Sequence, residues 1–168
     1  DPWKTVKKNG KVQQAHDIAL AEDGSMRALV LSPEGKVFSF DAKTDTFFPL
    51  PEINPVKNLH FDVICLALGR PHAIDFSTNN LYRHDGKDWV LLDNGNALYV
   101  AGAPDALVVL NKKGEAFLCE DNKWKSLGKK SFHRILAADA KHIYAIADDG
   151  ATGYGTYEFR ADGWLKRA

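Results

Sequence analysis

One aromatic residue stands near the end of each quarter of the sequence, and this repetition is the feature that most limits how the chain folds. The four markers are Phe47, Trp89, Trp124 and Trp164, and Trp3 precedes them at a similar interval. Repeats of roughly 40 residues are typical of β-propeller blades and of other repeat arrays. The four quarters of the sequence are therefore predicted to be copies of one unit.

Each quarter contains the same four pieces in the same order. A short apolar run, a turn, a second run, a second turn and a third run lead to the marker, and a short fourth run follows it. The first runs begin at Asp17, Asp62, Ala97 and Arg134. The runs are rich in Val, Ile, Leu, Phe and Tyr and are bounded by Gly, Asp, Asn or Pro, a pattern that indicates strands rather than helices. The most helix-like stretch, residues 132–145, aligns with strand runs of the other quarters and is predicted as strand.

The repeats predict an all-β chain, folded as a four-bladed β-propeller with four short antiparallel strands per blade. Residues 1–168 form a single domain, with blades at approximately 13–53, 59–94, 96–128 and 132–168. Residues 3–8 complete the ring, and Trp3 to Val6 pair with the last blade and remove its open edge. A β-sandwich is the alternative, since it also uses many short strands with turn signals.

Charge and hydropathy exclude two classes of partner. Lys plus Arg and Asp plus Glu both number 22, so the chain lacks the basic excess that binds nucleic acid. No apolar stretch approaches the roughly 20 residues that span a bilayer, so we expect no membrane insertion. The start Asp1-Pro2-Trp3 is compatible with a cytoplasmic protein or with one exported after signal cleavage.

The cysteines do not form a recognisable framework. Cys65 and Cys119 stand far apart in the sequence, in different quarters, and neither belongs to a metal-binding spacing. We interpret them as two free thiols rather than a disulfide. No metal site and no cofactor are predicted.

The segments HDIALAEDG and GKVFSFD and the closing Trp residues resemble tectonin-type repeats, as found in tachylectin-like propellers. The last quarter, ILAADAKHIYAIADDGATGYGTYEFRADGW, is the most similar. The second strand of a tectonin repeat usually carries a Trp, and here those positions hold Leu29, Ile74, Val108 and Tyr144. The resemblance implies a propeller that binds sugars or other surface ligands.

Histidine and aspartate stand close together at several places, and such a pair can orient an imidazole for base catalysis. The examples are His16-Asp17, His60 to Asp62, His72 to Asp75 and His84-Asp85. They recur because the repeats recur, so structural hydrogen bonding is the favoured interpretation. The nucleophile, phosphate-loop and zinc motifs of common enzymes are missing from the sequence. We predict no catalytic residue and no enzymatic activity.

Two segments are candidates for binding. The turn at 148–155 is longer than its counterparts and carries three Gly and Tyr154, which together with Tyr157 and Trp164 forms one candidate site. The Pro-rich segment 47–57 offers Phe48, Leu50 and Ile53 as an apolar contact patch.

Three functions remain open at this point. Because the four quarters share no repeated ligand set, a non-catalytic module that recognises a single protein partner, for example an enzyme that it inhibits, is favoured. A tectonin-like lectin that binds a glycan near Tyr154, Tyr157 and Trp164 is the alternative. A hydrolase that uses a His–Asp pair is the third.

Overall fold

Strands occupy the apolar runs, and turns occupy the segments rich in Gly, Asp and Asn. The computed structural model describes residues 7–8, 11–12, 17–20, 27–41, 43–44, 46–50, 59–120, 123–150, 153–161 and 163–167. Residues 132–145 contain one strand, a turn and the start of a second strand, as the alignment of the quarters predicts.

Four antiparallel sheets of four strands follow one another along the chain, and in each the strands pair in sequence order. The first two blades are β3 (Asp17–Leu20), β4 (Arg27–Leu31), β5 (Val37–Asp41) and β6 (Thr46–Pro49), then β7 (Phe61–Ala67), β8 (Arg70–Asp75), β9 (Leu81–His84) and β10 (Trp89–Asp93). The last two are β11 (Ala97–Ala103), β12 (Ala106–Asn111), β13 (Ala116–Glu120) and β14 (Lys123–Ser126), then β15 (Arg134–Ala137), β16 (Ile143–Asp148), β17 (Tyr154–Arg160) and β18 (Gly163–Lys166). A hairpin of β1 (Lys7–Lys8) and β2 (Lys11–Val12) precedes them.

The core consists of apolar layers between consecutive blades. All six residues of β12 are buried, because the strand serves two layers at once. Leu107 and Val109 pack against the second blade, and Val108 and Leu110 pack against the fourth. Successive side chains of a strand point to opposite faces, so a continuous apolar run fits a sheet that is covered on both sides. Each such Leu or Val contributes about 1.5–3 kcal/mol through burial.

A backbone hydrogen bond repeats at each junction between consecutive blades. The N–H group that begins one blade donates to the carbonyl of the turn between the second and third strands of the preceding blade. The pairs are Phe61 to Gly35 at 3.1 Å, Ala97 to Asn79 at 3.0 Å and Phe132 to Gly114 at 2.9 Å. The three turn residues have φ of 73°, 57° and 76°, a conformation that Gly and Asn adopt with little strain. We call this feature the inter-blade joint.

Two of the four marker aromatics pack on an aromatic residue at the start of the inner strand of their own blade. Trp89 packs on Phe61 with ring centroids 4.6 Å apart, and Trp164 packs on Phe132 at 4.3 Å. Trp124 is different, since 38% of it is exposed. Phe47 instead packs on Phe40 of its own blade, with ring centroids 4.8 Å apart. The sequence period therefore reflects one closing aromatic per blade.

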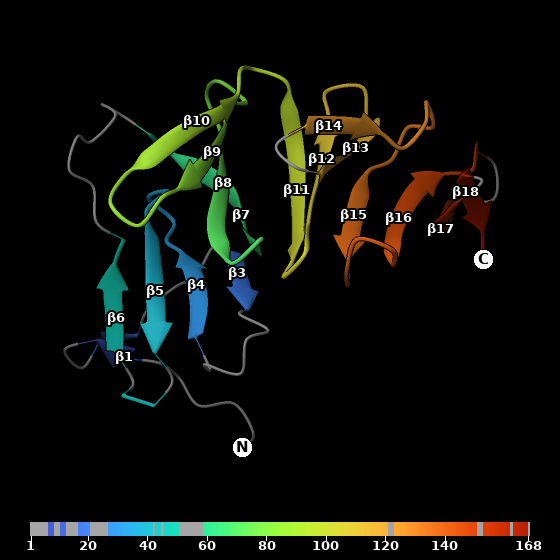
Figure 1. The fold of residues 1–168 in the computed structure, drawn as a ribbon. Helices are drawn as coiled ribbons and strands as arrows, with labels where there is room; N and C mark the ends of the chain where they lie inside the picture. The colour runs from blue at the N-terminus through green and yellow to red at the C-terminus, as the bar shows by residue number, and fades with distance from the viewer. Residues whose placement is uncertain are drawn as a thin grey trace.

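The blades fan out from their inner strands in an arc (Figure 1). β3 contacts β7, β7 contacts β11, and β11 contacts β15. Within the described residues, no packing of comparable extent joins the first blade to the fourth. Figure 1 accordingly shows β3–β6 and β15–β18 at opposite ends of the arc.

The prediction of an all-β propeller with four blades of four antiparallel strands is confirmed. All four strands of the last blade come from the last quarter of the chain. Trp3 to Val6 lie outside the described residues, so their pairing with that blade stays a prediction, as do the predicted domain and blade boundaries.

Candidate functional site

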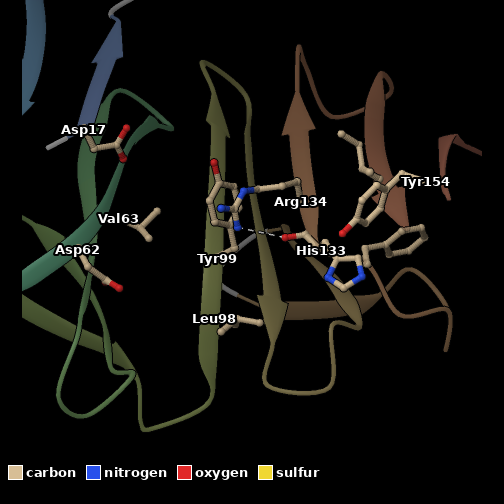
Figure 2. A pocket seen from close by; sticks show the side chains of 10 residues that line it. Asp17, Asp62, Val63, Leu98, Tyr99, His133, Arg134 and Tyr154 are labelled. Carbon is tan, nitrogen blue, oxygen red and sulfur yellow. Dashed lines mark hydrogen bonds between the residues drawn. The ribbon is translucent and has the colours of Figure 1, made fainter. Parts of the chain in front are cut away.

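Residues from all four blades line one hollow of about 870 Å³ (Figure 2). We call it the inner hollow. Its lining comprises Asp17, Asp62, Val63, Leu98, Tyr99, Phe132, His133, Arg134, Ile146 and Tyr154. A hollow of this size is within the range of about 300–1,000 Å³ typical of ligand pockets.

Two β-bulges contribute residues to this lining. The pairing of β7 with β8 shifts between Phe61 and Val63, and the pairing of β11 with β12 shifts between Ala97 and Tyr99. Asp62 and Leu98 are the extra residues at these shifts, and both line the hollow. A bulge inserts a residue into a strand and redirects its side chain, a common device next to binding sites.

Arg134 and Tyr99 form a stacked pair across neighbouring blades. The guanidinium carbon of Arg134 lies 4.8 Å from the centroid of the Tyr99 ring, within cation–π range. Its Nη1 donates to the carbonyl of His133 at 3.3 Å, shown as a dashed line in Figure 2. Burial raises the pKa of the half-buried Tyr99 hydroxyl, an effect that the charge of Arg134 opposes. Arg134 is itself exposed, so it presents a planar cation to a ligand.

Acidic side chains come from the first two blades. An Asp17 carboxylate oxygen accepts the N–H of Ile64 at 3.2 Å, which ties the first blade to the second. Asp62 is half-buried on β7. Figure 2 shows both carboxylates on the side of the hollow opposite His133 and Tyr154, with Arg134 between. The hollow is therefore electrostatically polarised, with anions near the first two blades and a cation at the fourth.

Tyr154 is the one residue of the predicted C-terminal site that lines the hollow. Tyr154 is 73% exposed as a residue, and its ring meets the His133 ring edge-on at 5.5 Å. Tyr157 is instead buried in the layer between the third and fourth blades, where its hydroxyl donates to Asp149 and Lys130 lies over its ring. Trp164 is half-buried against Phe132 and Phe159. The structure does not bring these three aromatic residues to one surface.

The second predicted patch lies away from the inner hollow. Phe48 is on β6, the outermost strand of the first blade, and is 51% exposed. Leu50 is half-buried against the core layer between the first two blades. Ile53 lies outside the described residues. The described members of this patch thus occupy the outer edge of the arc.

The histidine–aspartate pairs of the second blade have structural contacts. The backbone N–H of His60 donates to the buried Asp75 carboxylate at 2.9 Å, and Ser77 and Thr78 donate to it as well. Burial opposes ionisation of Asp75, but these hydrogen bonds outweigh it and lower its pKa. The His72 and His84 rings are buried, the latter against Trp89 at 5.1 Å. His16 lies outside the described residues.

One imidazole does meet a carboxylate, at a different place. His142 Nδ1 lies 2.7 Å from Asp139 in the turn between β15 and β16, and both side chains are well exposed. The hydrogen bond from His142 lowers the pKa of Asp139. Both backbone N–H groups that precede β16, those of Lys141 and His142, also donate to Asp139, which is the pattern of a turn.

Three further observations concern the described part of the chain. No helix there is long and apolar enough to span a membrane. No group of three metal-binding side chains occurs in it. No disulfide joins Cys65 to Cys119, and burial raises the pKa of the Cys65 thiol.

Solved β-propellers resemble this fold over nearly the whole chain. Human WBSCR16 has a TM-score of 0.67 at 12% identity, covering 93% of this chain and 53% of its own. YCF48 from Cyanidioschyzon merolae has a TM-score of 0.64 at 17% identity, covering 99% and 59%. Prp20p from Saccharomyces cerevisiae has a TM-score of 0.63 at 15% identity, covering 94% and 48%.

The chain has the β-propeller fold. It spans about half the length of the solved propellers that it matches. No family model matches the sequence, and no curated protein matches it. The propeller nature of the repeats is supported, and their tectonin type stays a prediction.

Proposed function

We propose that this chain is a non-catalytic binding module whose inner hollow receives a segment of one protein partner. The observation that carries the proposal is the convergence of four different blades on one hollow, each with its own side chains. A lectin with one site per blade needs the same residues in every blade, whereas one asymmetric surface suits one partner. Prp20p, a similar propeller, binds the proteins Gsp1p and histones.

The charges of the hollow define the segment that fits it. Arg134 offers a fork of N–H donors, the geometry that matches a carboxylate. Asp17 and Asp62 would accept an ammonium or guanidinium group on the opposite side. Val63, Leu98 and Ile146 add apolar surface between them. A peptide with an acidic residue near a basic one satisfies all three requirements.

The test compares two arginines of the whole chain. A partner captured from lysate is purified, and its affinity is measured by calorimetry for the wild type, for Arg134→Ala and for Arg70→Ala. Arg70 is also exposed, but it stands at the start of β8 and does not line the inner hollow. We expect Arg134→Ala to weaken binding about thirtyfold, which corresponds to an interface hot spot of about 2 kcal/mol, and Arg70→Ala to have no effect. An equal loss of affinity in both variants, or no loss of affinity in either, would contradict the inner hollow as the binding site.

A tectonin-like lectin is the second candidate, and the exposed ring of Tyr154 at the rim of the hollow favours it. Aromatic rings with one open face are suited to stacking on sugars. Tyr157 and Trp164, however, have their rings packed in the core, which leaves one open aromatic face of the three. A glycan array distinguishes the two functions: strong saccharide binding that Tyr154→Ala abolishes would replace the protein partner with a glycan.

A further inference from the structure

The second and fourth blades each contain a cluster of three aromatic rings, which we call the aromatic trio. A trio consists of the phenylalanine that makes the inter-blade joint, a tyrosine of the third strand and the marker tryptophan. The members are Phe61, Tyr82 and Trp89 in the second blade and Phe132, Tyr157 and Trp164 in the fourth. The phenylalanine contacts both other rings, with centroids 5.9 and 4.6 Å away in the second blade and 5.8 and 4.3 Å away in the fourth. It therefore links the tyrosine to the tryptophan.

In the third blade, Ala97 stands at the position of this phenylalanine. The N–H of Ala97 donates to the carbonyl of Asn79 at the inter-blade joint, as the N–H of Phe61 donates to that of Gly35. A β-bulge follows directly after both residues. The backbone is therefore equivalent at the two positions, but the side chain of alanine ends at Cβ. The third blade has the joint and the bulge without the central ring of the trio.

The other two positions of the trio are aromatic in the third blade as well. Trp124 pairs with the residue two positions after Phe117, just as Trp89 pairs with the residue two positions after Tyr82. Residues that are directly opposite or two apart share one face of a sheet, so Phe117 and Trp124 lie on the same face. Phe117 is also opposite Val109, which packs against the second blade. Both rings therefore face the second blade, without the phenylalanine that links them elsewhere.

A pocket of about 140 Å³ lies at this place, and we call it the outer pocket. It is lined by Asp93, Asn96, Val109, Asn111, Phe117 and Trp124. An apolar cavity of about 150 Å³ is large enough to bind benzene, so one aromatic ring fits the outer pocket. Trp124 is 38% exposed, whereas Trp89, which has its phenylalanine partner, is 5% exposed. The pocket is therefore accessible to a ligand from outside the chain.

The charge of the outer pocket comes from Asp93, the half-buried last residue of β10. Asn111 uses its side chain within its own turn, where Nδ2 donates to Glu115 at 2.9 Å. The two lysines that flank Trp124 in the sequence point to the opposite face of β14, because successive side chains of a strand alternate. A positive group beside the bound ring would therefore complement the Asp93 carboxylate.

We propose that the outer pocket binds the ring of a phenylalanine in a protein partner, with a basic residue of the same segment beside Asp93. The ring completes the trio of the third blade, and the chain itself seats a phenylalanine side chain at the two equivalent places. Tilted and edge-on contacts with Phe117 and Trp124 are arrangements that aromatic pairs prefer. The outer pocket shares no lining residue with the inner hollow, so this inference does not depend on the proposed function.

The first test uses a capped dipeptide of para-fluorophenylalanine and arginine, whose binding to the whole chain is measured by fluorine NMR. We expect saturable binding in the millimolar range and a shift of the Trp124 indole N–H signal, which is assigned by its loss in Trp124→Phe. A second dipeptide with glutamate in place of arginine should bind about fivefold more weakly, the upper range for one partly exposed ion pair. Asp93→Asn should make the two affinities equal. Equal affinities in the wild type would overturn the assignment of the charge to Asp93.

A variant that fills the pocket with the chain's own ring is the second test. Val109 stands where the blades with a complete trio have Ala73 and Ala145, so Ala97→Phe with Val109→Ala copies their arrangement. This variant should bind the arginine dipeptide at least about tenfold more weakly than the wild type. Circular dichroism verifies its fold. If it does not fold, Trp124→Ala on the outermost strand removes one wall of the pocket and should cause a similar loss.

Three outcomes would overturn the proposal. They are no saturable binding of the arginine dipeptide to the wild type, undiminished binding to a folded variant in which the pocket is filled or lacks its tryptophan wall, and a Trp124 signal that does not move. A third probe, para-fluorophenylethylammonium, carries the ring and the charge without a peptide backbone. We expect it to bind more weakly than the dipeptide. Tighter binding would assign the outer pocket to a free aromatic amine and overturn the protein partner.

Discussion

His72 is the residue at which proton binding and folding are most directly linked. Its ring is 1% exposed in the second blade, and Nδ1 lies 3.0 Å from the carbonyl of Arg70. Burial lowers the pKa of His72 to about 4, and the nearby charge of Arg83 acts in the same direction. The folded chain therefore keeps this imidazole neutral at pH values where an unfolded chain protonates it.

We predict that stability falls as the pH drops from about 6.5 to about 4, because the unfolded state then binds a proton that the folded state does not. The contribution of His72 to this loss is on the order of 3 kcal/mol. The variant His72→Gln lacks the titrating group and should show a flatter dependence over this window. Urea unfolding at pH 7 and at pH 4.5 gives the change in unfolding free energy for the wild type and for the variant. Equal changes in the two proteins would contradict the assignment of this pH dependence to His72.

Residue spacing along a strand also explains why Tyr154 and Tyr157, predicted to form one site, point in different directions. Tyr154 and Tyr157 stand three positions apart on β17, an odd separation that places them on opposite faces of the strand. One reaches the hollow and the other enters the core. Sequence reasoning grouped them because both flank a Gly-rich turn. Arg134 was missed as a site residue because it opens an apolar run, although a charge at the start of an inner strand was a usable signal.

At the scale of elements, the inter-blade joint makes some glycines much less replaceable than others. Gly114 has φ of 76°, and a Cβ atom there would meet Ser131 at 2.4 Å and the Phe132 carbonyl oxygen at 2.7 Å. Gly69, in the turn between β7 and β8, has φ of 69°, but a Cβ atom there would meet no described atom within 4 Å. Both positions have a left-handed backbone that strains any residue other than Gly. Only at Gly114 would an added Cβ atom also clash with neighbouring atoms.

We predict that Gly69→Ala costs about 1–2 kcal/mol through the left-handed backbone alone. Gly114→Ala should cost at least about 1–3 kcal/mol more, the range of overpacking, because the fourth blade must shift to admit the methyl group. Urea unfolding of both variants gives the difference directly. Equal losses of stability in the two variants would mean that the fourth blade can shift at the inter-blade joint without an energetic cost.

The strands and turns of this fold are the part that a sequence predicts well. Runs such as residues 106–111 carry enough apolar residues to bury both faces, and Gly or Asn marks most turns. The bulges at Asp62 and Leu98 are different, because one extra residue changes neither the length nor the hydropathy of a run noticeably. Since these bulges supply part of the hollow, its lining was only partly predictable.

For the whole molecule, blade packing predicts a gradient of local stability. The second and third blades are covered on both faces, whereas the first and fourth each pack on one neighbour within the described residues. We expect amides of β12 to exchange with solvent at least tenfold more slowly than those of β16, an effect of about 1.4 kcal/mol or more in local opening. Hydrogen exchange of the whole chain, followed by mass spectrometry of its fragments, measures the protection of each strand. Uniform protection across the blades would contradict the gradient.

The number of blades was readable from the sequence, but their curvature was not. The period of Phe47, Trp89, Trp124 and Trp164 counts repeats, and each repeat folds into one sheet. The angle between consecutive sheets depends on the bulk of side chains in each layer, and no local pattern encodes it. The curvature of the arc is therefore seen in the three-dimensional arrangement of β3, β7, β11 and β15 (Figure 1), and not in the sequence.

The inter-blade joint has a consequence for how such a chain can change over generations. Its donor and acceptor are main-chain atoms, so the bond persists whichever side chain begins the next blade, as Phe61 and Ala97 illustrate. Mutation can therefore exchange Asp62, Tyr99 or Arg134 while the mechanical link between neighbouring sheets is inherited unaltered. The sequences of repeats joined in this way can diverge until their common origin is hard to detect. Each new combination of side chains then lines a different cavity, while the arrangement of the blades stays the same.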